Sequence, residues 1–104
     1  MGIDPGVIAK LKEQHGKIFI VTASYADEEV QVACKLPKGE AIKRFALAAK
    51  AGNEIEAQDG FFADLVVYPD PVKLADDMYP LVPQIVAVMV ETLGIGKKAT
   101  AKKA

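Results

Sequence analysis

The sequence FFADLVVYPDPVKLADDMYPLVPQIVAVMVETL, residues 61–93, decides the fold. It contains four of the six prolines and much of the aliphatic bulk of the chain, so we expect the remaining residues to pack around it. Asp70 followed by Pro71 signals a helix start, because the carboxylate can cap the first turn and proline at the first helical position lacks only an N–H that would be unpaired. A short helix should begin there and end before Pro80, which disfavours helical backbone at Tyr79.

A second helix is predicted from Leu81 to Leu93, closed by glycines after it. At about 100° per residue its apolar side chains cover an arc of roughly 200°, which is wider than one core-facing stripe. Such a helix lies in the centre of the domain, keeps part of its surface for a partner, or does both. An exposed edge, if there is one, would lie near Val86 and Val90. The predicted partner-binding residues are Val82, Val86, Met89, Val90 and Leu93.

Two segments earlier in the chain have the composition and alternation of strands. Residues 17–24 are rich in β-branched side chains, and residues 29–36 alternate apolar and polar positions. The short acidic linker between them favours an antiparallel hairpin, although it lacks the Asn-Gly or Asp-Gly of a two-residue turn. Because two strands alone are only marginally stable in water, helices must cover at least one face.

Three further helices are predicted. The first starts at Asp4-Pro5 and ends near Gly16, and the second covers residues 40–51, with Ile42, Phe45, Ala46 and Ala49 at helical spacing. Residues 54–68 are ambiguous, because residues 65–68 can also form a strand. We favour a helix throughout, since Asp59 and Asp64 break any alternating pattern over the longer segment. The predicted fold class is α+β, an antiparallel β-hairpin packed against four to five short helices.

The chain of 104 residues fits one domain, which we place at residues 1–94, followed by a disordered basic tail over residues 95–104. The composition, 51% hydrophobic and 26% charged, is that of a globular protein. The tail contains four of the 13 basic residues, so the body carries nine basic residues against 14 acidic ones. This acidic body argues against nucleic acid as a partner.

Three further features indicate a soluble protein of a reducing cytoplasm. The longest uninterrupted apolar run, residues 85–90, is much shorter than the roughly 20 residues that span a bilayer. A single cysteine excludes an internal disulfide framework. Residues 1–11 also lack the basic and continuous apolar regions of a signal peptide.

No catalytic or metal-binding constellation is predicted. The one histidine, His15, and the one cysteine, Cys34, lie on different predicted elements, so they cannot form a His/Cys metal site. We interpret Cys34 as an inert thiol on the inward face of a strand, and His15 as a residue near a helix C-terminus. No glycine-rich nucleotide-binding motif occurs. We therefore expect no enzyme activity, no metal and no cofactor.

Several segments occur in an informative order. They are IDPGVIAKLKEQHGKIFIV (residues 3–21), two strands ending at Pro37, Arg44-Phe45 in a helix, VVYPDPVKL (residues 66–74) and YPLVPQIVAVMVETLG (residues 79–94). In this order the chain resembles the tail assembly chaperone-like proteins encoded among the tail genes of long-tailed phages and prophages. The resemblance covers most of the chain, and Val-Tyr-Pro-Asp before a helix is its strongest part.

This resemblance implies a non-enzymatic protein of the host cell cytoplasm. Such proteins are thought to keep the long, coiled-coil-prone tape-measure protein soluble until tail-tube subunits polymerise around it. The implied partners are the tape-measure protein and the tail-tube subunit. The apolar arc of the last helix leaves a homo-oligomer open, and the composition predicts neither nucleic acid nor a membrane as a partner. The alternative is a virion structural protein, a neck or tail-completion subunit that self-assembles through the hairpin edge or the last helix. A small enzyme is a third hypothesis that no residue cluster supports.

Removal of the basic tail should leave the fold unchanged. Residues 97–104 contain no apolar side chain other than alanine, and exposed termini contribute little to stability. A chain truncated after Gly96 should therefore unfold within a few degrees of the full chain when both are melted and followed by circular dichroism. A large decrease in the melting temperature would show that the tail docks on the body.

Overall fold

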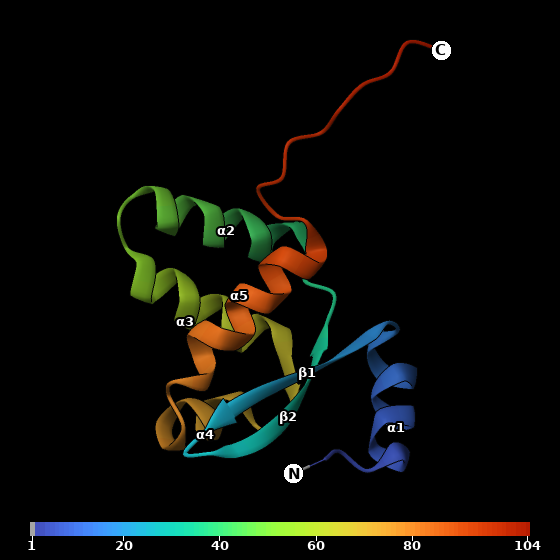
Figure 1. The fold of residues 1–104 in the computed structure, drawn as a ribbon, viewed down its shortest axis with the longest axis vertical. Helices are drawn as coiled ribbons and strands as arrows, with labels where there is room; N and C mark the ends of the chain where they lie inside the picture. The colour runs from blue at the N-terminus through green and yellow to red at the C-terminus, as the bar shows by residue number, and fades with distance from the viewer. Residues whose placement is uncertain (1) are drawn as a thin grey trace.

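The computed structural model describes residues 2–104, and within them a three-stranded antiparallel sheet is surrounded by five helices (Figure 1). This confirms the α+β class and the hairpin, and adds a third strand to it. The sheet has the order β1-β2-β3. The elements are α1 (Pro5–His15), β1 (Ile18–Tyr25), β2 (Glu28–Lys35), α2 (Gly39–Lys50), α3 (Glu54–Leu65), β3 (Val66–Tyr68), α4 (Pro71–Asp77) and α5 (Leu81–Leu93).

The helix ends follow the local signals of the sequence. The carboxylate of Asp4 accepts a hydrogen bond from the Gly6 N–H at 2.7 Å, and that of Asp70 accepts one from the Val72 N–H at 3.0 Å. Each bond satisfies one of the N–H groups that a helix leaves unpaired at its start. At the end of α5, Gly94 adopts left-handed backbone with a φ of 71°. The N-termini of α1 and α4 and the C-terminus of α5 therefore lie where the sequence predicts them.

The prediction of one helix over residues 54–68 is wrong at its C-terminal end. Helix α3 stops at Leu65, and residues 66–68 form β3, which pairs antiparallel with β2. The β-branched Val66 and Val67 suit a strand, and the free edge of β2 offers backbone partners that a helix would leave unpaired. The two aspartates that argued against a strand precede β3, so they do not oppose a strand of only three residues.

The β-hairpin closes with a turn of two residues, Ala26 and Asp27, between the paired residues Tyr25 and Glu28. Both turn residues have positive φ, 51° and 64°, as in the turns that match the right-handed twist of paired strands. The sequence lacks the glycine or asparagine that usually supplies this backbone. Ala26 is therefore held in the left-handed region by the pairing of the strands around it.

Helix α5 forms the centre of the core. It packs on one face of the sheet at β1, and α3 and α4 contact it from the sides. The same sheet face presents side chains from both long strands, which belong to one hydrophobic cluster with α5. The buried members from β1, β2 and α5 are Val21, Ala23, Val30, Val32, Cys34, Leu81, Val82, Ile85, Val86 and Met89.

Helix α1 lies on the second face of the sheet. The Ile3 N–H, just before α1, donates to Gln31 Oε1 at 3.1 Å. Gln31 alternates with the core residues Val30 and Val32, so its side chain points away from α5. Leu11 of α1 is buried but lies outside the main core cluster. The sheet is thus a middle layer between α5 and α1, which lie on its opposite sides in Figure 1.

Helix α2 packs mainly on α3, at the outside of the molecule (Figure 1). The rings of Phe45 and Phe61 stack at the interface, with centroids 4.5 Å apart. Of the predicted apolar face, Ile42 and Phe45 are partly buried, whereas Ala46 and Ala49 are exposed. The buried stripe is narrower than predicted, because α2 has one main neighbour instead of two.

The packed part of the chain extends slightly beyond the predicted boundary at residue 94. Ile95 is partly buried against the core, and its N–H donates to the Val90 carbonyl at 3.0 Å. Residues 97–104 form no helix or strand, are exposed, and run away from the body in Figure 1. No helix within residues 2–104 is long and apolar enough to cross a membrane.

A better turn sequence should stabilise the hairpin. Replacing Ala26 by Asn and Asp27 by Gly should raise the free energy of unfolding by about 1 kcal/mol, because these residues adopt left-handed backbone at lower cost. Urea denaturation followed by circular dichroism measures the change. Ala26→Val, which forces a β-branched side chain into the same backbone, should lower the stability. Equal stability of the three proteins would contradict the turn geometry.

The two sides of α5 should respond differently to the same substitution. Val86 is buried, whereas Val88 is 44% exposed. Val86→Ser should lower the free energy of unfolding by about 2–3 kcal/mol, since it leaves a cavity and buries a hydroxyl group. Val88→Ser is the matched control and should change it by less than about 0.5 kcal/mol. Similar losses in both variants would show that α5 is not oriented as described.

Candidate functional site

The five partner-binding residues predicted on α5 divide into two groups. Val82, Val86 and Met89 are buried in the core, whereas Val90 and Leu93 are only partly buried. A partner could reach the first three only if the domain opened, so Val86 does not mark an exposed edge. The wide apolar arc of α5 is used by the sheet, α3 and α4 together. Of the five predicted residues, only Val90 and Leu93, in the C-terminal half of the helix, remain within reach of a partner.

Partly buried hydrophobic residues from α2 and from the end of α5 border the same core cluster. We call this set the α2–α5 rim. In Figure 1 the C-terminal end of α5 lies near the start of α2, and both helices contribute residues that border the core. The members of the rim are Ile42, Phe45, Val90, Leu93 and Ile95. Because each side chain is neither fully buried nor fully exposed, the rim can still bury apolar surface against a partner.

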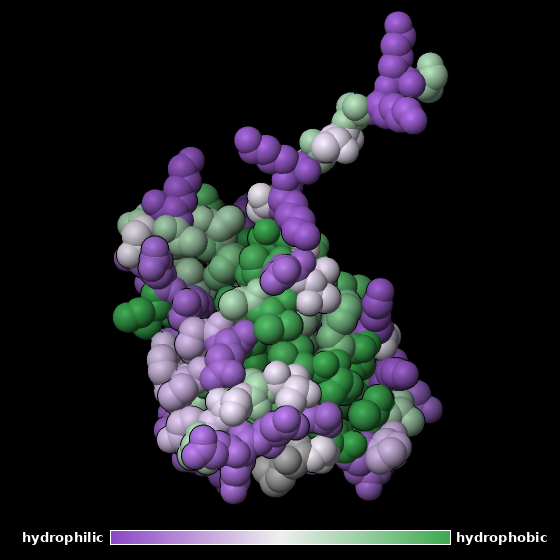
Figure 2. Space-filling model, viewed as in Figure 1, coloured by the Kyte–Doolittle hydropathy of each residue, from purple (hydrophilic) through white to green (hydrophobic). Residues whose placement is uncertain are grey.

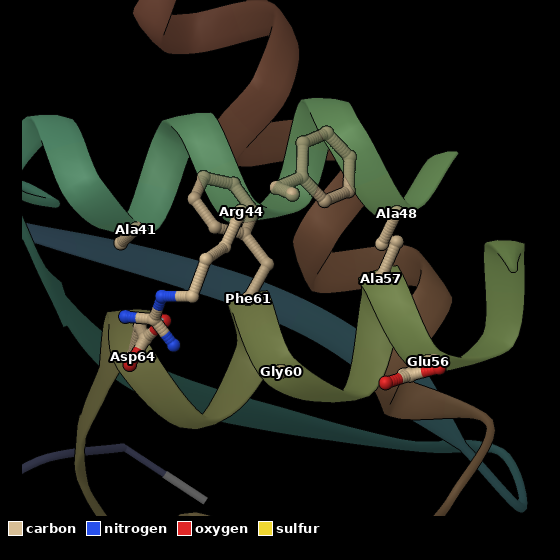
Figure 3. Close-up of a pocket in the computed structure, with 9 residues that line it drawn as sticks. Ala41, Arg44, Ala48, Glu56, Ala57, Gly60, Phe61 and Asp64 are labelled. Carbon is tan, nitrogen blue, oxygen red and sulfur yellow. The ribbon is translucent and has the colours of Figure 1, made fainter. Parts of the chain in front are cut away.

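A shallow groove between α2 and α3 adjoins this rim (Figure 3). Small residues line its two sides, Ala41 and Ala48 from α2 and Ala57 and Gly60 from α3, and Phe45 is shared with the rim. Its volume is about 220 Å³. A Cβ atom added at Gly60 would meet no atom within 4 Å. The small residues on its two sides therefore leave space for one apolar side chain of a partner.

Charged residues stand at both ends of this groove. Arg44 Nη2 lies 3.3 Å from Asp64 Oδ2 at one end, and Glu56 lies at the other (Figure 3). The Arg44–Asp64 pair is largely exposed, so its contribution to stability is about 1 kcal/mol at most. It ties α2 to α3. Because of these charges, we expect the groove to bind an apolar group that has polar groups on both sides of it.

A second apolar groove lies between α3 and α4, with a volume of about 300 Å³. The Tyr79 hydroxyl donates to Asp59 Oδ1 at 2.7 Å and connects the segment before α5 to α3. This hydrogen bond raises the pKa of Tyr79, and desolvation and the carboxylate charge add to the effect. The phenol therefore remains protonated at neutral pH. Because the Tyr79 hydroxyl already bonds to Asp59 within the groove, we assign the polar groups of this groove a structural role.

The structure also places the single cysteine and the single histidine that the sequence analysis considered. Within residues 2–104 no group of three His, Cys, Asp or Glu side chains is placed to hold a metal ion. Cys34 is buried, and desolvation raises the pKa of its thiol to about 12. Its thiolate is absent at neutral pH, which agrees with the prediction of an inert cysteine. His15 is exposed beside Gly16 at the end of α1, as the sequence indicated.

Sequence reasoning missed two parts of this surface. The contribution of α2 to the rim was not predicted, although the spacing of Ile42 and Phe45 was recognised as an apolar face. The bond network of Gln84 was also missed: its side-chain amide accepts from the Ser24 N–H at 3.1 Å and donates to the Ser24 carbonyl at 2.8 Å. These residues are 60 positions apart, and no local pattern signals such a contact.

Comparison with known proteins identifies the fold but no family. No family model matches the chain, and no curated protein sequence matches it. One solved structure is similar, that of an uncharacterised protein from Bacillus stearothermophilus, with a TM-score of 0.71 and 17% identity. The alignment covers 91% of this chain and 99% of the other. At this identity the similarity shows that the two chains share a fold, and nothing about what either of them binds.

Proposed function

We propose that this protein is a non-enzymatic, protein-binding protein that acts like a phage or prophage tail assembly chaperone, in the host cell cytoplasm. Its client is a helical segment of the tape-measure protein, and the client binds at the α2–α5 rim. The observation that carries the proposal is the half-buried state of the rim side chains from two neighbouring helices. The resemblance of the sequence supplies the identity of the client.

The chemistry of the rim suits an amphipathic helix. A helix presents apolar residues three and four positions apart, and it binds by laying that face against hydrophobic side chains of its partner. The rim offers such side chains from both α2 and α5, and the adjoining groove can receive one of the client's larger ones. A coiled-coil-prone chain exposes this kind of face whenever its own partner helix is missing. Covering that face would keep the client soluble.

Polar residues beside the rim favour reversible binding. Lys43 is exposed on α2, and Glu91 is exposed on α5 next to Val90. Charges of both signs can pair with the charged flanks of a coiled-coil helix, each exposed pair contributing at most about 1 kcal/mol. A chaperone must release its client to the assembling tail tube. A small apolar contact with weak ion pairs at its borders allows the client to be released.

The alternative function is a virion structural protein, a neck or tail-completion subunit that self-assembles into a ring. One observation favours it: β1 pairs only with β2 in the described chain, so its other edge is open. A ring, however, needs two different complementary surfaces on each subunit. Among residues 2–104 the two candidate surfaces are the rim and the open edge of β1. The rim consists of side chains on helices, whereas the open edge of β1 offers extended backbone, so the two surfaces do not complement each other.

Substitutions in the rim should weaken client binding without unfolding the protein. The double variant Val90→Ser, Leu93→Ser should lower the amount of tape-measure protein recovered in soluble form on co-expression by about tenfold, which corresponds to about 1.4 kcal/mol of binding free energy. The client is the long, coiled-coil-prone tape-measure protein that the resemblance implies. Pull-down of the tagged chaperone followed by quantitative blotting measures it.

A matched control uses apolar residues that are even more exposed. Leu47 on α2 and Ile55 on α3 are 62% and 70% exposed and lie outside the rim, so Leu47→Ser, Ile55→Ser should retain the client. Circular dichroism melting must show that both double variants are folded. A folded rim variant that retains the client fully would remove the rim from the proposal, and loss of the client in the control would move the site to α2 and α3.

A further inference from the structure

The outer edge of β1 carries backbone groups that no other strand pairs. In an antiparallel pair, successive residues alternately turn their N–H and C=O toward the partner strand and away from it. Ser24 turns both groups away from β2, because both bond to the side-chain amide of Gln84. The residues two, four and six positions before Ser24 therefore also turn their N–H and C=O groups away from β2. These residues are Thr22, Ile20 and Ile18.

Gln84 pairs with only one end of this edge. Its amide group makes at Ser24 the two hydrogen bonds that a neighbouring strand would make, and it bonds to no other residue of β1. Within residues 2–104, β1 pairs with β2 alone, so no strand covers the backbone of residues 18–22. An open edge of this kind attracts a further strand unless the protein blocks it with charged residues, proline or a bulge. Strand β1, with the sequence IFIVTASY, contains no charge and no proline, and its pairing with β2 is regular.

The surroundings of this edge are apolar. Figure 1 shows β1 in front of β2, between α5 and α1, and Figure 2 shows hydrophobic surface gathered over this part of the molecule. Ile20 is 39% exposed on the α1 side of the sheet, and Phe19 is partly buried on the α5 side. Val88 follows Gln84 by one helical turn, on the same side of α5, and is also exposed. A strand added here would therefore gain apolar contacts on both faces as well as hydrogen bonds.

We propose that the open edge of β1 pairs with β1 of a second copy of this chain, antiparallel and about a two-fold axis at Ile20. Ile20 then faces Ile20 of the other copy, and Ile18 faces Thr22. The three-stranded sheets of the two copies become one continuous sheet. Because the same surface serves both copies, the contact closes at two chains and forms a dimer.

The charges at the two ends of β1 favour this arrangement. Lys17 directly precedes β1, and Lys12 lies in the last turn of α1 before it. The turn that follows the strand carries Asp27, and Glu28 begins β2. Antiparallel pairing of two identical strands turns the basic end of each copy toward the acidic end of the other, so the charges at the two ends are complementary. A second copy supplies this complementary pattern automatically.

The dimer contact is independent of the proposed client. The client of the α2–α5 rim is helical, and a helix has no free backbone groups along its length to pair with a strand edge. The rim lies on α2 and the end of α5, whereas the dimer contact lies on β1. Loss of the dimer and loss of client binding are therefore separate observations, and neither implies the other.

Measurement of the mass in solution tests the proposal. Light scattering after size exclusion, and sedimentation at increasing concentrations, should give twice the chain mass of 11.1 kDa.

Ile20→Lys, which places two lysines opposite each other at the axis, should raise the dissociation constant at least about tenfold. Tyr68→Lys is the matched control, since Tyr68 is equally exposed at 39% and lies on β3 at the opposite edge of the sheet. It should remain dimeric. A wild-type chain that stays monomeric up to high concentration overturns the proposal, as does dimer loss in Tyr68→Lys alone.

A cross-linking variant tests the register without weakening the contact. Ile20→Cys places two thiols opposite each other at the axis, at a Cα separation of about 5.5 Å that a disulfide can span. The native Cys34 is buried and stays out of the reaction. Addition of a mild oxidant should convert Ile20→Cys, but not the control Tyr68→Cys, to a covalent dimer on a non-reducing gel. An Ile20→Cys protein that is folded by circular dichroism and fails to cross-link overturns the pairing.

Discussion

Burial of α5 on three sides is the constraint on which the rest of the structure depends. The sheet, α3 and α4 each cover part of this helix, and five of its thirteen residues are buried. A buried Val, Leu, Ile or Met side chain contributes about 1.5–3 kcal/mol. No polar or charged residue is buried among residues 2–104, and no buried side-chain nitrogen or oxygen there lacks a hydrogen bond. The core is thus held together by apolar contact, and it provides no group for acid–base chemistry.

This central position of α5 determines where a partner can bind. The helix uses most of its apolar surface inside the domain, and near its C-terminal end Val90 and Leu93 remain partly buried. There they join partly buried side chains of α2, a helix that packs on α3 from outside. The α2–α5 rim is therefore a consequence of an incomplete outer layer. Removal of the remaining apolar surface from water is the driving force that we propose for client binding.

The sheet has two edges of different character. At one edge β3 has only three residues and is followed directly by Pro69, which cannot donate to a further strand. At the other edge β1 has eight residues, and the outward backbone groups of Ser24 bond to the amide of Gln84, while no strand within residues 2–104 pairs with the outward groups of the residues before it. The same helix that organises the core thus protects one position of the open edge. We infer dimerisation from the positions that it does not protect.

The sequence by itself determined the elements that depend on local chemistry. Aspartate caps before Pro5 and Pro71, the alternation of residues 29–36, and the glycine after Leu93 act over a few residues, so the α+β class and most helix ends were predictable. The left-handed turn at Ala26-Asp27 was not, because strand pairing imposes it on residues without a turn signature. Residues 65–68 stayed ambiguous, because the β-branched Val66 and Val67 suit a strand but no local pattern shows that the edge of β2 lies beside them. Tertiary structure alone decided which α5 side chains stay accessible, since Val82, Val86 and Met89 differ from Val90 and Leu93 only in what packs on them. Burial is a property of neighbours distant in sequence, and the spacing of residues along one helix does not contain it.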